Sequence, residues 1–312
     1  MLNKSYSKKC KKCNSVEIKK DWFKRWRQRY KCKLCGHVFQ NKTRRKTVTT
    51  NKIWNEYCFW KQTYKQLSDT YKLSLKTIQK KLDQYSFIPK KISPKEVILL
   101  IDTTYFSDFG LMVFKDYQNK KMLHYKLVDN ENNTDYKNWV KELQDKWWII
   151  KAIVCDWRRW LLTGFWDIPT QMCNFHQVAI IRRYITKKPV LQANKDLKEL
   201  TSWLVRTDKE TFEYTLKCYG EYYKEFLQER WIDKQWKNYF IHRKTRSAYF
   251  SLKNNLKYLF TYYDYMWVID IPNTTNGLEW LFWHVKPKVS LHRGLKKERK
   301  IKLILSLLHG QF

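Results

Sequence analysis

Four of the eight cysteines form two closely spaced pairs near the N-terminus. Two residues separate Cys10 from Cys13, and eighteen residues later Cys32 and Cys35 repeat that spacing, followed by Gly36. A two-residue gap lets both thiolates of a tight turn reach one ion, and two such turns supply the four sulfur ligands that zinc prefers. The spacing therefore predicts one structural Zn²⁺ ion at these four cysteines. A pair of disulfides is the alternative, which a reducing intracellular compartment disfavours.

Three carboxylates stand at positions where acids could share a metal ion. Asp102 follows a buried-type strand at 97–101, Asp156 follows an apolar strand at 148–155, and Glu279 lies in the first turns of an amphipathic helix. Oxygen ligands suit Mg²⁺ or Mn²⁺, and two such ions roughly 4 Å apart can activate an attacking hydroxyl and stabilise the leaving oxygen at a phosphodiester. The alternative is that each aspartate caps a following helix and that Glu279 faces solvent.

The elements around these acids follow a recognisable order. Apolar patterns predict strands at 97–101, 109–114 and 122–128, a helix at 134–147, strands at 148–155 and 170–173, and a helix from Asn174. Three strands followed by alternating helices and strands is the order of the ribonuclease-H-like α/β fold, in which the ends of the first and fourth strands lie side by side. That order would bring Asp102 and Asp156 to one metal site.

Asp156 and Glu279 are 123 positions apart, which is too far for the last helix connection of such a core. Residues 195–265 are mostly helical by pattern, and their aromatic side chains suit a packed core better than base stacking. We therefore expect a catalytic core at 95–188 and 266–312, interrupted by a helical insertion at 189–265. In the Glu279 helix, four apolar side chains should face inward: Leu278, Leu281, Phe282 and Val285.

The N-terminal third carries its own small elements. Strands at 16–23 and 25–31 lie between the cysteine pairs and predict a zinc ribbon at 1–42. A helix at 51–60 precedes the segment TYKQLSDTYKLSLKTIQKKLDQY, in which Ser74 is placed to cap a second basic helix. This pattern predicts a helix-turn-helix at 49–88, although any two short amphipathic helices would look similar. The side chains expected to read DNA are Lys76, Thr77, Gln79 and Lys80.

The charge of the chain points to a polyanionic partner. The 312 residues contain 63 Lys and Arg against 29 Asp and Glu, a formal net charge of +34, and the first 95 residues alone hold 27 basic and 5 acidic residues. A concentrated basic region is what binding to a phosphate backbone requires, whereas a merely solvated basic surface is the alternative. No apolar run approaches the length of a membrane span, so we expect a soluble, cytoplasmic protein with no membrane partner.

These motifs together resemble one family over nearly the whole chain. The zinc ribbon, the helix-turn-helix and the blocks IDTTYF, AIVCDWRRWL, MCNFHQ and TTNGLEW are similar to those of DDE transposases of the bacterial insertion-sequence and Mutator-like group. The resemblance implies that Asp102, Asp156 and Glu279 are the catalytic acids, and that two Mg²⁺ or Mn²⁺ ions are the cofactors. Similar transposases also carry a helical insertion at this point of the core.

The resemblance extends to two smaller features. A Cys-x2-His signature matches Cys173 and His176, which could orient an active-site ligand, contact DNA or pack at a strand–helix junction; we assign them no metal from the sequence. A basic tail after Glu279 matches a K…H-x-G pattern and is expected to follow the DNA backbone. Its members are Lys286, Lys288, His292, Arg293 and Lys296.

The resemblance therefore implies a DNA transposase that binds terminal inverted repeats, cleaves 3′ ends and transfers them to target DNA. Its partner would be double-stranded DNA, and joining two ends implies a dimer or larger homo-oligomer. Two alternatives stay open: a catalytically inactive DNA-binding regulator built from the zinc ribbon and helix-turn-helix, and a structure-specific nuclease without strand transfer.

Overall fold

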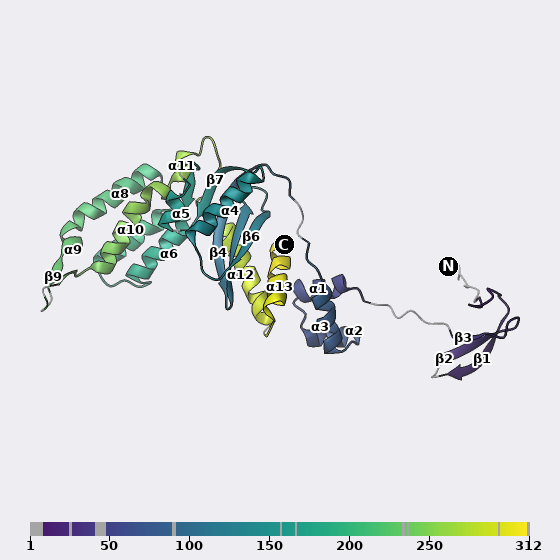
Figure 1. The fold of residues 1–312 in the computed structure, drawn as a ribbon. Helices are drawn as coiled ribbons and strands as arrows, with labels where there is room; N and C mark the ends of the chain where they lie inside the picture. The colour runs from purple at the N-terminus through teal and green to yellow at the C-terminus, as the bar shows by residue number, and fades with distance from the viewer. Residues whose placement is uncertain are drawn as a thin grey trace. The chain divides into compact units, whose positions relative to one another are not determined.

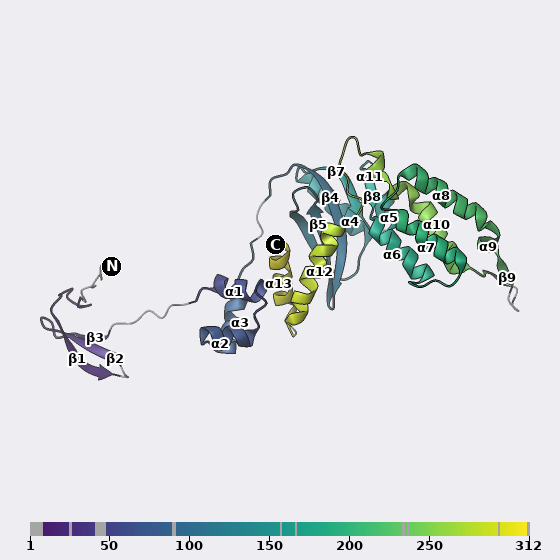
Figure 2. The same cartoon turned by 180° about the vertical axis from the view of Figure 1, so that it is seen from behind.

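The chain divides into two compact units, Met1–Ile53 and Trp54–Phe312. The computed structural model describes residues 9–24, 27–40, 48–88, 92–156, 158–165, 167–232, 235, 237–292 and 294–310. Figure 1 shows the elements of both units, and Figure 2 shows the same chain from behind. Within the described residues, no helix combines the length and apolar character that a membrane span requires.

The first unit contains a small antiparallel sheet. Strands β1 (Ile18–Lys24), β2 (Arg27–Cys32) and β3 (Val38–Gln40) pair in the order β1-β2-β3. The first two strands begin two residues later and end one residue later than predicted, and the third was not predicted. Phe39 and the sulfurs of Cys10 and Cys32 form its small buried core. So small a core needs a further source of stability, such as a metal ion.

Three short helices follow. Helix α1 spans Thr50–Cys58, α2 spans Tyr64–Tyr71 and α3 spans Leu75–Gln84. Thr63 and Gln66 form a reciprocal capping box at the start of α2. The predicted cap of α3 is confirmed, since the Ser74 hydroxyl accepts a hydrogen bond from the Thr77 N–H at 3.2 Å.

A five-stranded mixed sheet forms the centre of the second unit. Its strands are β4 (Glu96–Phe106), β5 (Phe109–Asp116), β6 (Met122–Val128), β7 (Ile149–Cys155) and β8 (Thr170–Met172), in the order β6-β5-β4-β7-β8. Strands β4, β7 and β8 are parallel, whereas β4, β5 and β6 form an antiparallel meander. The predicted α/β class is confirmed, and this topology is compatible with a ribonuclease-H-like core.

Helices cover both faces of this sheet. Helix α4 (Asn133–Asp145) packs on one face, where the Tyr136 hydroxyl lies 2.7 Å from the Thr103 hydroxyl of β4. Helix α12 (Asn276–Leu291) lies against the other face (Figures 1 and 2). The β4–α12 approach is close at Gly277, where an added Cβ would stand 3.7 Å from the Leu100 side chain. Helices α5 (Arg159–Thr163) and α6 (Asn174–Ile185) flank β8.

The region between α6 and α12 is mainly helical. It contains α7 (Gln192–Trp203), α8 (Lys209–Tyr222), α9 (Lys224–Gln228), α10 (Arg243–Leu259) and α11 (Thr261–Asp264). A two-stranded ribbon of β9 (Arg230–Ile232) and β10 (Asn238–Phe240), which was not predicted, interrupts these helices. The aromatic side chains Phe212, Tyr219 and Tyr249 are buried in the main core, as expected for packing residues.

The last helix, α13 (Lys297–His309), contacts the short helices that precede the sheet. Arg299 forms a bidentate pair with Asp83 of α3, with both N–O distances 2.8 Å, and the Trp54 indole N–H donates to the Ser306 hydroxyl at 3.2 Å. Residues 54–88 of the expected helix-turn-helix therefore belong to the second unit.

Candidate metal and nucleic-acid site

The parallel pairing of β4 and β7 aligns the two aspartates. Leu100 pairs with Val154, so the same register, carried two residues further, places Asp102 beside Asp156. Cys155 pairs with Met172 of β8, and the Cys173 N–H donates to the Cys155 carbonyl at 2.8 Å. Asp102, Asp156 and Cys173 consequently stand at one level across three neighbouring strands.

Asp102 lies within β4 rather than at its end. The sequence predicted that the strand stops at Ile101, but β4 continues to Phe106 because its last residues pair with β5 in a tight hairpin. Asp102 nevertheless lies level with the carboxyl end of the neighbouring strand, because β7 ends at Cys155. Alternation along the strand turns Asp102 and Leu100 toward α12, while Thr103 faces α4.

The surroundings of Asp102 disfavour its negative charge. Burial raises the pKa of this carboxyl to about 7; His176 opposes the shift, and Asp156 and Glu279 add to it. The Thr103 N–H donates to Asp102 Oδ1 at 2.8 Å, and this hydrogen bond partly offsets the burial. A carboxylate that is buried beside two other acids is stabilised by a bound cation, which would lower its pKa.

Asp156 is held by a local network that sequence reasoning missed. Burial raises its pKa, and so does the nearby Glu131 in the segment before α4. The Arg158 N–H donates to Asp156 Oδ1 at 3.3 Å, and the Arg158 guanidinium pairs with Glu131. Tyr136 also donates to Glu131. The Asp-x-Arg spacing of Asp156 and Arg158 is the one signal in the sequence that could have indicated this pair.

Glu279 reaches the same cluster from α12. Its Oε1 lies 3.8 Å from His176 Nδ1, and the Thr275 hydroxyl lies 3.4 Å from the same oxygen. Burial raises the pKa of Glu279, and His176 works against that shift. Burial also disfavours the charged imidazole of His176, but Cys173, Asp102 and Glu279 outweigh it and raise the pKa of His176 to about 9. All three predicted acids therefore share one electrostatic environment.

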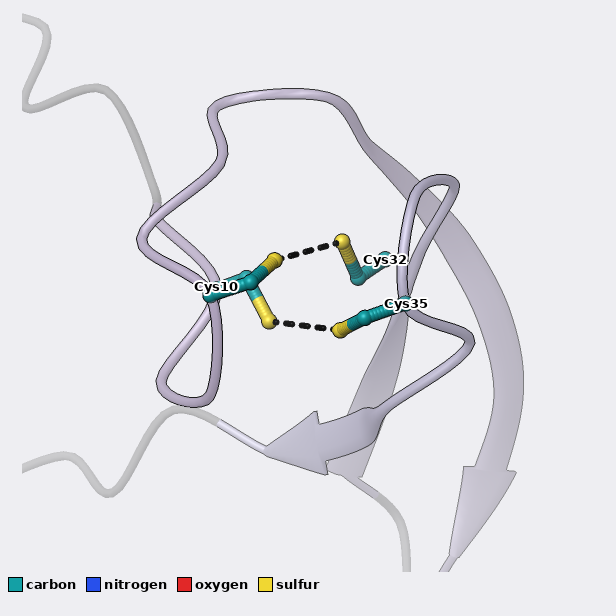
Figure 3. A group of neighbouring side chains, drawn as sticks. Cys10, Cys32 and Cys35 are labelled. Carbon is teal, nitrogen blue, oxygen red and sulfur yellow. Dashed lines mark hydrogen bonds between the residues drawn. The ribbon is translucent and has the colours of Figure 1, made fainter.

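The four N-terminal cysteines also come together. Their sulfurs all lie within 4.8 Å of one another, with Cys10 and Cys35 3.5 Å apart and Cys13 and Cys32 3.5 Å apart (Figure 3). A tetrahedral ion with Zn–S bonds of about 2.3 Å separates its sulfur ligands by about 3.8 Å. The Cys35 N–H lowers the pKa of Cys32, which favours the thiolate form that binds metal. This group can therefore bind a zinc ion.

The predicted DNA-contacting residues differ in exposure. Lys76 and Lys80 are exposed on α3, and Thr77 and Gln79 are half-buried. In the basic tail, Lys286 is exposed, and Arg293 lies outside the described residues.

Two members of the basic tail that were expected to follow the DNA backbone are buried. Lys288 and His292 are only 8% and 9% exposed. The His292 ring packs on Tyr57 with centroids 4.0 Å apart, and burial lowers the pKa of both Lys288 and His292. Their side chains join α12 to α1 and are not available at the surface.

A cavity of about 1200 Å³ lies beside the start of α12. Aromatic side chains, among them Phe87, Tyr262 and Trp280, line it together with three lysines, Lys115, Lys120 and Lys121. No carboxylate is among the described residues that line it. Lys115 donates to the Gly277 carbonyl at 3.1 Å, which places one lysine of the cavity at the beginning of the Glu279 helix.

Because the pKa of Asp102 is raised, replacing its carboxyl group should stabilise the folded protein by an amount that depends on pH. The folded-state pKa of about 7 exceeds the ordinary value of 3.8. At a pH between these two values, Asp102 is therefore protonated in the folded chain and ionised in the unfolded chain. The metal-free protein should therefore lose stability as pH rises through this range. Asp102→Asn should raise the melting temperature more at about pH 8 than at about pH 5. Calorimetry in chelator tests this, and an equal change at both pH values would contradict it.

Comparison with known proteins gives distant similarity to solved structures. No family model matches the chain, and no curated protein matches it. Among solved structures, the chain is similar to one described as "Drosophila P element transposase strand transfer complex", with 11% sequence identity and a TM-score of 0.42. The match covers 86% of this chain and 93% of that one. A similarity of this size does not place the chain in a family.

Proposed function

We propose that the protein is a metal-dependent DNA transposase of the DDE type, encoded by an insertion sequence. The observation that carries this proposal is the convergence of Asp102 in β4, Asp156 directly after β7 and Glu279 in α12 on one half-buried and electrostatically coupled cluster. An acidic cluster inside a chain of net charge +34 suits an enzyme that binds a polyanion and places acids at a metal site.

Each carboxylate has a defined task in this proposal. Asp102, Asp156 and Glu279 would hold two Mg²⁺ or Mn²⁺ ions, which supply Lewis-acid stabilisation of the attacking and leaving oxygens of a phosphodiester. Arg158 keeps Asp156 directed toward the cluster through its N–H and its ion pair with Glu131. Thr275 holds the start of α12, and with it Glu279, against the β8–α6 junction.

The reaction would proceed in two steps at this site. Water attacks the phosphodiester at an element end and exposes a 3′-hydroxyl, and that hydroxyl then attacks target DNA. The cavity at the start of α12 would offer three lysines and several aromatic groups to a DNA strand, and one of these lysines, Lys115, donates to the Gly277 carbonyl two residues before Glu279. The zinc-binding unit and α3 would bind the terminal repeats, and a homo-oligomer would bring two ends together.

Reversing the charge of Lys76 and Lys80 should weaken binding to DNA ends. Both side chains are exposed on α3, and each phosphate contact that is lost should reduce the salt dependence of log K by roughly 1. We expect Lys76→Glu with Lys80→Glu to lower affinity at least about tenfold at low salt. Fluorescence anisotropy at several salt concentrations measures this. Lys141→Glu, on the exposed side of α4, is the control; equal losses in both proteins would argue against α3 as the DNA-binding helix.

The overall proposal is tested with DNA from the two boundaries of the element that surrounds this gene. Labelled end duplexes are incubated with protein, Mn²⁺ and a plasmid target, beside a Glu279→Gln variant. Joined products that depend on Glu279 are the expected result. End binding without cleavage would instead favour a DNA-binding regulator, and cleavage without joining would favour a nuclease.

A further inference from the structure

A second group of metal-ligating atoms adjoins the three acids. Cys173 follows β8, His176 lies in the first turn of α6, and Glu279 lies in the first turn of α12. One ligand atom from each lies within 4.8 Å of the other two. Among the described residues, this group and the four N-terminal cysteines are the two clusters of this kind.

The sulfur of Cys173 is already arranged as a ligand. It is fully buried and accepts two hydrogen bonds from Thr275, one from the N–H and one from the hydroxyl, each at 3.3 Å. Donors of this kind commonly surround metal-bound thiolates, where they fix the sulfur and balance its charge. Thr275 is the N-cap residue of α12, but its side chain makes no capping hydrogen bond. It would instead support Cys173 as a ligand by donating hydrogen bonds to its sulfur.

The other two ligands, His176 and Glu279, are partly exposed to solvent. The side chains of His176 and Glu279 are each 25% exposed, and His176 Nδ1 lies 3.8 Å from Glu279 Oε1. That nitrogen is buried and makes no hydrogen bond to any described residue. For metal–ligand bonds of about 2.0–2.3 Å, tetrahedral ligands stand roughly 3.3–3.8 Å apart, so small side-chain rotations would close the set.

We propose that Cys173, His176 and Glu279 form a site for a thiophilic divalent cation such as zinc. Sulfur, imidazole and carboxylate ligands together suit zinc, whereas Mg²⁺ avoids thiolate ligands. Three protein ligands leave a fourth position for water. A cation bound here engages Glu279 Oε1, so zinc would compete with Mg²⁺ or Mn²⁺ for that carboxylate. The site is separate from the four-cysteine group and does not depend on the proposed transposase activity.

The experiment measures zinc bound per chain in protein equilibrated with a slight excess of zinc, without DNA or magnesium. Atomic emission should give two ions for the wild type and one for Cys173→Ser. The control is Cys218→Ser, which removes a half-buried thiol of α8 outside both clusters and should keep two ions. One ion in the wild type, or two in Cys173→Ser, would overturn the proposal.

A second variant tests the site without changing the buried cysteine, whose replacement could disturb folding. Glu279→Gln keeps the shape of a partly exposed side chain but removes its charge, so its fold should persist by circular dichroism. We expect it to weaken binding of the second zinc at least about tenfold, since carboxylate charge contributes to zinc affinity. Unchanged affinity for the second ion would exclude Glu279 as a ligand. Because both readouts are binding measurements, they remain informative even if no DNA is cleaved.

Discussion

Asp102→Asn should abolish metal-dependent cleavage of DNA ends while leaving DNA binding intact. The substitution removes the charge of the carboxyl at the centre of the cluster, the one whose pKa burial raises to about 7. Asparagine keeps the shape and the Thr103 contact but cannot offer an anionic oxygen to a cation. We expect the cleavage rate to fall about a thousandfold or more, equivalent to roughly 4 kcal/mol of transition-state stabilisation.

Single-turnover cleavage of a labelled end duplex in Mn²⁺ measures this effect, and anisotropy on the same duplex measures binding. Asp145→Asn, at the exposed end of α4, is the matched control and should cleave at the wild-type rate. A loss of less than about tenfold in Asp102→Asn would mean that this aspartate is not a metal ligand in the reaction.

Cys13→Ser should unfold the first unit and leave the second unit folded. Cys13 is exposed, so a serine there disturbs no buried packing, and any loss of folding must come through the lost metal ligand. The buried core of this sheet is small, whereas structural zinc contributes on the order of 10 kcal/mol to such domains. We expect affinity for DNA ends to fall at least about tenfold, since this unit belongs to the most basic part of the chain.

Amide NMR spectra with and without a zinc chelator would follow residues of β1 to β3 directly. In Cys13→Ser these signals should collapse to unfolded positions, while those of the sheet β4 to β8 remain dispersed. Cys218→Ser should give the wild-type spectrum for the first unit. A dispersed β1–β3 spectrum in zinc-free protein would refute a structural role for zinc.

The sheet of the second unit was largely predictable because its strands are continuous apolar runs. Strand β6 has the predicted bounds, and β5, β7 and β8 differ by one or two residues at an end. The exception is β4, which continues past Asp102 because the polar residues after it pair with β5. A pairing partner supplied by a hairpin is invisible to an argument from hydrophobic periodicity alone.

The residues of the site were less predictable where they depend on distant packing. Leu278, Leu281, Phe282 and Val285 are buried as helical spacing predicted. The burial of Lys288 and His292 was not foreseen, since it arises from Tyr57 and Cys58 of α1, far away in the sequence. Glu131 and Thr275 were also missed, because only the folded chain brings them to Asp156 and Cys173.

The central claim is that Asp102, Asp156 and Glu279 together bind divalent cations. Crystals of the protein bound to an end duplex, grown with Mn²⁺, would test it most directly through anomalous scattering. The account predicts Mn²⁺ peaks within bonding distance of carboxylate oxygens from all three residues, and their loss in crystals of Glu279→Gln. An ordered cluster without manganese, or manganese held only by other residues, would contradict it.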